Sequence, residues 1–335
     1  MSTILGNPIT LGGGGLELVA NVDTGATVTA TLGSKTVTGV SVGGQARLKI
    51  PQEGKWTVSA ESGAMVSAPY EVSVPATVDI ALLKQELNDN SWAAIKQASD
   101  ANMGANFWAV GDCKQITMNG KVSDGLTLSN YSAWVYIIGF NHNAEREGNG
   151  ISFQGFKATD KGTDVCLVDS GYDSSHASGT WFNMKNTNNN SGGWQASSMR
   201  TVVMPLIKAA FPADLQAVIK SSTIYTDNTG GGTSGVVPTT TQDDVFLLAE
   251  YEVFGTRSQA SSEEPNYLKQ YSYYSAGNSK VKYKHNATSD AASWWERSPH
   301  PDRFESGWDC CVYTDGKASF ETVYYSYGVS PAFKV

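Results

Sequence analysis

The sequence predicts a mainly β protein in two parts, an N-terminal β-sandwich followed by a larger α+β domain with two helices and long loops. Three observations lead to this prediction. Short alternating runs recur roughly every ten residues between positions 18 and 83. Two helical patterns follow position 197, and the composition of 34 Gly, 15 Tyr and 9 Trp residues indicates aromatic, loop-rich surfaces.

Five runs bounded by glycine or proline predict the strands of the sandwich. They are residues 27–32, 35–38, 46–50, 56–60 and 70–74. Residues 50–58 (IPQEGKWTV) resemble a strand of immunoglobulin-like and carboxypeptidase-regulatory-like modules. The resemblance implies an Ig-like β-sandwich over residues 19–84, serving as a spacer or docking domain. Residues 1–18 contain four consecutive glycines, so we expect an arm or attachment peptide that does not pack by itself.

Charge and hydropathy exclude several classes of protein. The formal net charge is −8 and the basic residues are scattered, which argues against nucleic acid as a partner. No run of eighteen apolar residues occurs, so we expect no membrane insertion. The N-terminal residues lack the basic and apolar regions of a signal peptide, so release from a cell is expected to use another route.

A helix is predicted in the linker that follows the sandwich, residues 85–104. Residues 90–91 offer an N-cap, and Trp92, Ile95 and Ala98 fall on one face. We therefore expect this helix to pack on the next domain, residues 105–335.

The last domain has helical patterns at residues 198–210 and, after Pro212, at 213–220. The β-branched and aromatic run 323–329 predicts a strand that closes a sheet. Loops 180–193 and 227–241 are polar and long enough to be functional or mobile. Asp243 and Asp244 precede a buried strand, where we expect a cap or ion-pair partners.

Motifs for catalysis are weak. Residues 150–155 (GISFQG) miss a nucleophile elbow by one residue, and the four histidines lie in separate loops without metal-type spacing. Cys113, Cys166, Cys310 and Cys311 match neither a zinc nor a redox spacing. We expect reduced, partly buried thiols, although spacing leaves a Cys113–Cys166 pair open. The sequence thus predicts that the protein is not an enzyme.

Spaced motifs from residue 107 onward resemble a C-terminal domain of unknown function found in phage tail-fibre-like and bacterial surface proteins. The motifs are FWAVGD (107–112), VYIIGFNHN (135–143), Trp194 with SSMR (197–200), DVFLLAEYEVFG (244–255), WWERSP (294–299) and GVSPAF (328–333). The resemblance spans roughly residues 91–335 and implies a C-type-lectin-like fold, akin to formylglycine-generating enzymes. Those enzymes bind copper through two spaced cysteines. The adjacent Cys310 and Cys311 lack that spacing, so the activity does not transfer.

The resemblance assigns a structural role to six residues of its last two motifs. They are Trp294, Trp295, Arg297, Pro299, Gly328 and Pro331. The paired tryptophans are expected to anchor the core beside a polar turn, each indole N–H with a partner. The sequence departs from the family pattern at Glu296, where leucine is usual, and at Ser330, where arginine is usual.

One tripeptide raises the question of calcium. Residues 264–266 (EPN) resemble the calcium- and mannose-binding loop of C-type lectins, which makes Glu264 and Asn266 weak candidate ligands. A solvated turn is the alternative, and we expect no cofactor.

Aromatic rings interleaved with small polar residues predict a binding surface in the last hundred residues. The candidate receptor-binding residues are Tyr271, Tyr273, Tyr274, His300, Arg303, Phe304, Trp308, Asp309, Tyr313, Tyr324 and Tyr325. The alternative is that many of these rings fill the core.

Together these features predict a phage virion protein of a tail fibre, tail tip, baseplate or capsid fibre. It would act as a receptor-binding adhesin that binds a protein or glycan of the bacterial surface. Assembly would occur in the host cytoplasm with release by lysis, and partners would include other virion proteins and copies of the chain, as a homotrimer. The alternatives are a baseplate or capsid decoration protein without receptor binding, and an enzyme that degrades surface polysaccharide.

Overall fold

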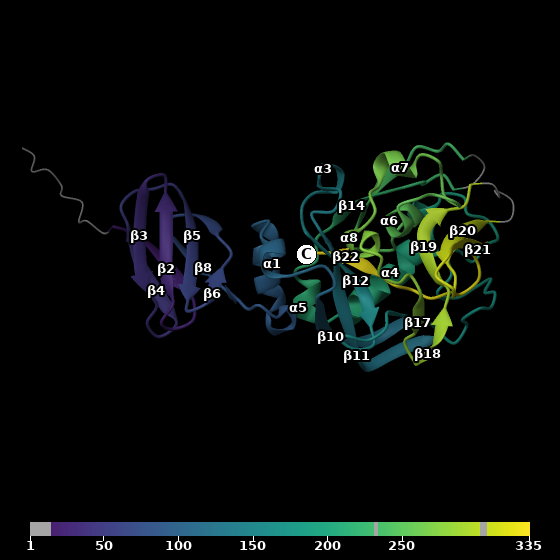
Figure 1. Ribbon diagram of the computed structural model, residues 1–335, viewed down its shortest axis with the longest axis horizontal. Coiled ribbons are helices and arrows are strands. Elements are labelled where there is room, and N and C mark those ends of the chain that lie inside the picture. The colour runs from purple at the N-terminus through teal and green to yellow at the C-terminus, as the bar shows by residue number, and fades with distance from the viewer. Residues whose placement is uncertain (1–14, 231–233, 302–306) are drawn as a thin grey trace, which may run out of the picture. The chain divides into compact units, whose positions relative to one another are not determined.

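The computed structural model describes residues 15–230, 234–301 and 307–335. Strands take 42% and helices 17% of the chain, which confirms the prediction of a mainly β protein. The chain divides into two compact units, Met1–Leu83 and Lys84–Val335, which the colour bar of Figure 1 separates near the change from purple to blue.

The strands of the N-terminal unit form two sheets. They are β1 (Leu16–Asn21), β2 (Thr27–Leu32), β3 (Lys35–Val40), β4 (Gln45–Ile50), β5 (Lys55–Ser62), β6 (Met65–Ser67), β7 (Tyr70–Ser73), β8 (Ala76–Asp79) and β9 (Leu82–Leu83). One sheet has the order β4-β1-β8, and the other has the order β3-β2-β5-β6-β9 with β7 beside β5. Each of the five predicted runs coincides with all or part of one of these strands.

Period-two burial explains why both sheets share one core. In β4 the alternate residues Leu48 and Ile50 are buried, and they belong to one apolar cluster with Val28 of β2 and Trp56 of β5. The Trp56 indole is fully buried and donates to the Gln52 carbonyl at 3.2 Å. Strand β1 takes in the last residues of the predicted arm 1–18, whose residues 1–14 lie outside the described part of the chain.

Helix α1 (Trp92–Asp100) begins where the polar pair at 90–91 predicts. The Ser91 hydroxyl accepts a hydrogen bond from a first-turn amide at 3.1 Å, which is an N-cap. Trp92 and Ile95 are buried, and the Trp92 ring meets Phe153 edge to face with centroids 5.4 Å apart. The predicted linker helix is therefore an integral part of the C-terminal unit.

The central sheet of the C-terminal unit has five strands. They are β10 (Cys113–Ser123), β11 (Leu126–Phe140), β12 (Ile151–Lys157), β22 (Ala332–Lys334) and β16 (Val245–Phe246), in that order. The last strand of the chain thus lies between β12 and β16, and Phe333 stacks on Phe153 at 5.4 Å. The prediction of a closing strand at 323–329 was wrong, because that segment makes only isolated bridges, such as those of Val329 with Leu167 and of Ser326 with Tyr172.

Three smaller sheets complete the C-terminal unit. They contain β13 (Val165–Cys166), β17 (Lys282–Lys284) and β18 (Ala287–Ala292); β14 (Ser222–Thr226) and β15 (Thr239–Asp243); and β19 (Trp294–Pro299), β20 (Trp308–Val312) and β21 (Ala318–Thr322). The predicted loop 227–241 therefore includes part of a strand. Strand β19 ends at Pro299.

The helical prediction at 198–210 is confirmed by η3 (Met199–Val203) and the continuous α4 (Met204–Ala210). The prediction at 213–220 is only partly confirmed, because α5 (Ala213–Gln216) ends early. The other short helices are η1 (Leu87–Asp89), α2 (Gly104–Phe107), α3 (Ala144–Glu147), η2 (Trp194–Ala196), α6 (Glu250–Phe254), α7 (Glu264–Tyr267) and α8 (Ser272–Ser275). Within the described residues, no helix has the length and apolar character needed to span a membrane.

The cysteines are free thiols, as the sequence predicts, and no Cys113–Cys166 bond forms. Burial raises the pKa of the Cys113 thiol to about 11 and that of the Cys166 thiol to about 12. Burial also raises the pKa values of Cys310 and Cys311 well above the usual range. Protonated, buried thiols are poor nucleophiles and poor metal ligands.

The N-cap of α1 gives a test of the fold. Replacing Ser91 by alanine leaves a first-turn amide without its acceptor, so we expect the free energy of unfolding to fall by about 1 kcal/mol. Urea unfolding followed by tryptophan fluorescence measures this loss. The exposed Ser272, at the start of α8, is the control position, and Ser272→Ala should change stability by less than about 0.5 kcal/mol. Equal effects of the two substitutions would contradict the capping role.

Candidate functional site

The structure places three of the predicted receptor-binding tyrosines in the core. Tyr271, Tyr273 and Tyr274 are at most 5% exposed. The Tyr274 hydroxyl donates to Gln154 at 2.6 Å, and the Tyr273 hydroxyl donates to the buried Asp164 carboxylate at 3.1 Å. These rings hold the unit together and cannot contact a receptor, so their prediction as surface residues was wrong.

The remaining predicted residues separate into three groups. His300 and Asp309 are 7% and 2% exposed, so they are also unavailable to a large partner. Arg303 and Phe304, which were also predicted to bind a receptor, lie outside the described part of the chain. The predicted residues that remain at least partly exposed are Trp308, Tyr313, Tyr324 and Tyr325.

The residues assigned a structural role are all buried: Trp294, Trp295, Arg297, Pro299, Gly328 and Pro331. The indole N–H of Trp294 donates to the Lys280 carbonyl at 3.0 Å, and that of Trp295 donates to the Phe182 carbonyl at 2.9 Å. The prediction of a core anchor with satisfied indoles is confirmed.

Arg297 makes the most extensive polar contacts of β19. Its guanidinium forms two bonds with Glu252, at 2.6 and 2.8 Å, and it also donates to the carbonyls of Leu247 and Tyr225 and to the Thr226 hydroxyl. Burial alone would raise the pKa of Glu252, but the Arg297 charge outweighs burial and holds that pKa below its usual range. The pair is therefore ionised inside the protein.

A buried histidine lies beside this pair and raises the question of a metal. Ligand atoms of His142, Glu147 and Glu252 lie within 4.8 Å of one another. However, Lys334 already bonds Glu147 at 2.8 Å, and Arg297 already bonds Glu252. A divalent ion would meet two buried cations here, so the donor set fits an ion-pair network and not a metal centre.

His142 itself is neutral in this network. Its ring stacks on Tyr271 with centroids 3.5 Å apart, and its Nε2 has no hydrogen-bond partner. Burial lowers the pKa of His142 to about 4. Spacing along the chain does not indicate these neighbours of His142, because tertiary packing brings Glu147 and Glu252 to it.

The predicted calcium ligands do not face a common site. Glu264 is buried and accepts hydrogen bonds from the Ser298 hydroxyl and from the Tyr251 amide. Asn266 is exposed, and its side chain donates to Glu263 at 2.9 Å. The tripeptide is the first turn of α7, and the candidate calcium pair Glu264 and Asn266 is not supported.

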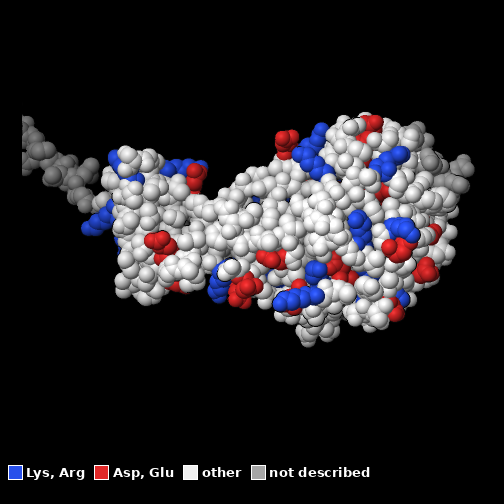
Figure 2. Space-filling view, in the orientation of Figure 1, with Lys and Arg blue, Asp and Glu red and all other residues white. Residues whose placement is uncertain are grey.

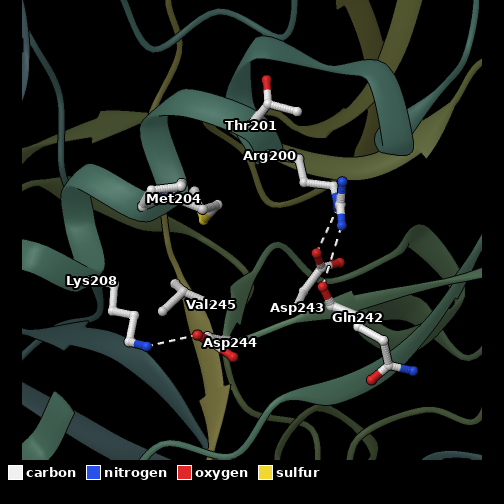
Figure 3. A pocket seen from close by; sticks show the side chains of 9 residues that line it. Arg200, Thr201, Met204, Lys208, Gln242, Asp243, Asp244 and Val245 are labelled. Carbon is white, nitrogen blue, oxygen red and sulfur yellow. Dashed lines mark hydrogen bonds and ion pairs between the residues drawn. The ribbon is translucent and has the colours of Figure 1, made fainter.

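A groove of about 340 Å³ lies between α4 and the segment that joins β15 to β16 (Figure 3). Arg200 Nε lies 2.6 Å from Asp243 Oδ1, and Lys208 Nζ lies 2.6 Å from Asp244 Oδ2, with the Met204 side chain between the pairs. This confirms that Asp243 and Asp244 are ion-pair partners. Each carboxylate is paired with a basic side chain, so the groove offers a ligand no unpaired charge. The two ion pairs join η3 and α4 to Asp243 of β15 and to the following Asp244.

Aromatic rings gather on another part of the surface, where residues 174–176 run beside residues 324–326. The His176 amide donates to the Tyr324 carbonyl at 2.8 Å, and Ser175 forms a bridge with Tyr325. The His176 ring stacks on the Trp181 ring with centroids 4.0 Å apart and planes 14° from parallel. The rings of Tyr324 and Tyr325 lie 5.5 Å apart. We call Trp181, His176, Tyr324 and Tyr325 the aromatic platform.

Three glycines hold the platform rigid. A Cβ atom at Gly125, Gly171 or Gly179 would lie 2.6 to 2.9 Å from the Trp181 indole, so the ring rests directly on backbone. The adjacent Thr180 forms two hydrogen bonds with Asp124. The Thr180 amide donates to the Asp124 carboxylate at 2.8 Å, and the Thr180 carbonyl accepts from the Asp124 amide. The loop that carries Trp181 is thus fixed to the β10–β11 turn.

The chemistry of the platform suits recognition. All four residues are partly exposed, and the exposed Ser174, Ser175 and Ser178 lie next to them in the chain. Flat rings stack on the apolar face of a sugar or pack on a protein, while hydroxyl groups exchange hydrogen bonds with polar groups. Because the rings are already fixed, binding would order few side chains.

Sequence reasoning found Tyr324 and Tyr325 but missed Trp181 and His176. Loop 180–193 looks too polar to pack, yet its Phe182 is fully buried and anchors the loop. The glycines that lie against Trp181 are the signal that the sequence carries. Gly179 is close to Trp181 in the chain, but only the fold brings Gly125 to the ring.

Comparisons with known proteins add a family. The sequence matches a protein family described as a domain of unknown function, DUF6273, over residues 166–335. No curated protein and no solved structure matches the chain significantly. The matched region contains β19, the ion pair between Arg297 and Glu252, and all four residues of the aromatic platform.

The Arg297 network gives a prediction for stability. Arg297→Lys removes the paired contacts with Glu252 and leaves a buried carboxylate with a poorer partner. We expect a loss of about 3–5 kcal/mol in the free energy of unfolding, measured by urea denaturation. The exposed Arg146 is the control position, and Arg146→Lys should stay within about 0.5 kcal/mol of the parent. A similarly small effect at Arg297 would show that the network contributes little.

Glu264 gives a prediction for pH dependence. Burial, only partly offset by the Ser298 hydroxyl and the Arg297 charge, raises the pKa of Glu264 from 4.5 to about 7. The unfolded chain releases this proton near pH 4.5, whereas the folded chain keeps it until about pH 7. The folded state therefore loses stability as the pH rises between these values.

Glu264→Gln tests this effect, because glutamine has a similar shape, can still accept from the Tyr251 amide through its carbonyl oxygen, and cannot ionise. We expect the stability of the variant relative to the parent to increase by up to about 3 kcal/mol between pH 4.5 and pH 7.5. Urea midpoints at both pH values measure the difference. The exposed Glu145 is the control, and Glu145→Gln should show no such trend. A difference that is independent of pH would contradict a raised pKa.

Proposed function

The chain belongs to the DUF6273 family, and on that premise we propose that it is a receptor-binding adhesin of a phage virion rather than an enzyme. The observation that carries the proposal is the rigid, partly exposed aromatic platform on the matched domain. Fixed rings beside exposed serines have the chemistry of a recognition surface.

A neutral glycan of the bacterial surface is the partner that this chemistry favours. On the face seen in Figure 2, basic and acidic side chains are interspersed and form no block of one sign. Aromatic stacking with neutral hydrogen bonds needs no charged ligand, whereas a polyanion would need a basic surface. A surface protein presenting similar polar and apolar groups is a second partner for the same rings.

In this proposal the two units have different tasks. The C-terminal unit, with a C-type-lectin-like fold, binds the cell surface. The Ig-like sandwich of the N-terminal unit attaches the chain to other virion proteins in a tail fibre, tail tip, baseplate or capsid fibre. The assembly would be a homotrimer, formed in the host cytoplasm and released by lysis. Several copies of one weak site would then act together on a cell.

A structural role is the second candidate. The same platform could pack on a neighbouring virion protein in a baseplate or capsid decoration complex, because protein interfaces also use aromatic anchors. In that case the isolated chain would bind particle proteins and not cells. An enzyme that degrades polysaccharide is a third candidate, recognised by release of reducing sugar.

The test is binding of the labelled full-length chain to a panel of bacterial cells. We expect saturable binding to some strains, and Trp181→Ala should weaken it by about tenfold or more because the stacking ring is lost. Tyr70→Ala is the matched control, since Tyr70 is a 43% exposed ring on β7 of the N-terminal unit. It should leave binding unchanged.

A second platform variant protects this test against misfolding. Tyr325→Ala should also weaken binding, and thermal unfolding checks that both variants keep their fold. Binding by the parent that neither variant weakens would reject the platform. Absence of cell binding, with capture of particle proteins instead, would reject the adhesin in favour of the structural role.

A further inference from the structure

Three segments far apart in the sequence meet on the C-terminal unit at the start of β20. The Gly192 amide donates to the Thr229 carbonyl at 2.7 Å, and the Gly307 amide donates to the Asn188 carbonyl at 3.3 Å. The contacts are so close that a Cβ atom at Gly230 would lie 1.7 Å from the Asn190 carbonyl oxygen. Residues 188–193, residues 227–230 and the start of β20 therefore form one packed cluster.

Among the described residues, three buried oxygen atoms in this cluster have no hydrogen-bond partner. They are Asn190 Oδ1, Asp227 Oδ2 and Asp309 Oδ1, on residues that are 1%, 1% and 2% exposed. Burial and the negative charge of Asp227 raise the pKa of the Asp309 carboxyl group, and a hydrogen bond with the Asn190 side chain opposes this shift in part. A buried polar atom without a partner destabilises the folded chain, so three in one place need an explanation.

The surrounding contacts fix the direction of two of these oxygens. Asn190 Nδ2 donates to the carbonyls of His300 and Trp308, at 3.1 and 2.8 Å, so the amide cannot be reversed without facing oxygen with oxygen. Asp227 Oδ1 accepts from the Thr229 amide, from the Thr229 hydroxyl and from the Gly230 amide, at 2.7 to 3.1 Å. The open oxygens of Asn190 and Asp227 are therefore held in place by the fold.

The charge balance also needs a partner. Two carboxylates in a buried place repel each other unless a positive charge lies between them. Lys185 acts on Asp309, but its Nζ bonds the Ser191 carbonyl and lies 3.5 Å from Asn189 Oδ1. Lys185 therefore neutralises the pair only in part.

We propose that Asn190, Asp227 and Asp309 form a binding site for a calcium ion. Two carboxylate oxygens and one amide oxygen are hard ligands that suit calcium, whereas zinc prefers nitrogen and sulfur. Water would complete the coordination on the side of Thr229 and Asn188, which are exposed. The ion would join loop 188–193 and loop 227–230 to β20, and its role would be structural.

The site differs from the tripeptide 264–266 that the sequence suggested for calcium. It is also independent of the aromatic platform, so a negative result for cell binding would not contradict the calcium site. Its effect would be on the stability of the C-terminal unit, since the ion binds the folded chain and not the unfolded one.

The experiment uses the full-length chain, treated with chelator and then supplied with 5 mM calcium chloride. With the affinity of extracellular calcium modules, we expect calcium to raise the melting temperature by about 3–6 °C. Terbium, which replaces calcium, should show tryptophan-sensitised emission that calcium displaces. Magnesium at the same concentration should shift the melting temperature less.

Asp227→Asn and Asp309→Asn should each lose most of the calcium-dependent shift and the terbium signal. Asp315→Asn is the matched control, because Asp315 lies in the β20–β21 turn, exposed and paired with Lys317. It should keep the full shift. In chelator, Asp309→Asn should be at least as stable as the parent, because it removes a buried acidic group whose Oδ1 has no hydrogen-bond partner among the described residues.

A measurement on the parent chain keeps the proposal testable if the asparagine variants do not fold. Equilibrium dialysis with calcium should show saturable binding of about one ion per chain, and terbium should compete for it. No shift and no terbium emission from the parent chain would overturn the proposal. A full calcium shift in Asp309→Asn would overturn it as well.

Discussion

The C-terminal unit depends on one buried ion pair, between Arg297 and Glu252. An isolated charge in a protein interior costs several kcal/mol, so the fold must supply every partner of the guanidinium at once. Its partners come from β14, α6 and the segment after β16, which are joined to β19 through this one side chain. Because the geometry is satisfied only in the assembled unit, the pair favours a single arrangement of these otherwise short elements.

The same unit keeps other carboxyl groups without such partners. Both carboxyl oxygens of Glu296 are buried without a hydrogen bond, and burial raises its pKa well above the usual range. Glu296 is therefore a neutral acid, since among the described residues no cation forms a hydrogen bond with it as Arg297 does with Glu252. Neighbouring glutamates in one core thus differ in protonation, and the presence or absence of a hydrogen-bonded cation decides between them.

Rigid loops follow from this arrangement of the core. Apart from β10 and β11, the strands of the C-terminal unit are short and its connections are long, yet glycines allow the connections to pack closely on one another. Gly171 and Gly125 admit the Trp181 ring, and Gly230 admits the Asn190 backbone. Close packing of backbone explains how a surface rich in serine and asparagine can present fixed rings, which is what recognition at low entropic cost requires.

Local pattern was enough to determine the mainly β character, the five sandwich runs, the Ser91 cap and the burial of Trp294 and Trp295, because periodicity and capping act over a few residues. Which tyrosines face solvent was decided only by the tertiary structure. Tyr273 and Tyr324 have similar neighbours in the sequence, yet Asp164 draws one into the core and the bridge segment 324–326 leaves the other at the surface. The meeting of Asn190, Asp227 and Asp309 likewise has no local signature, because exposure and convergence depend on contacts between residues that are distant along the chain.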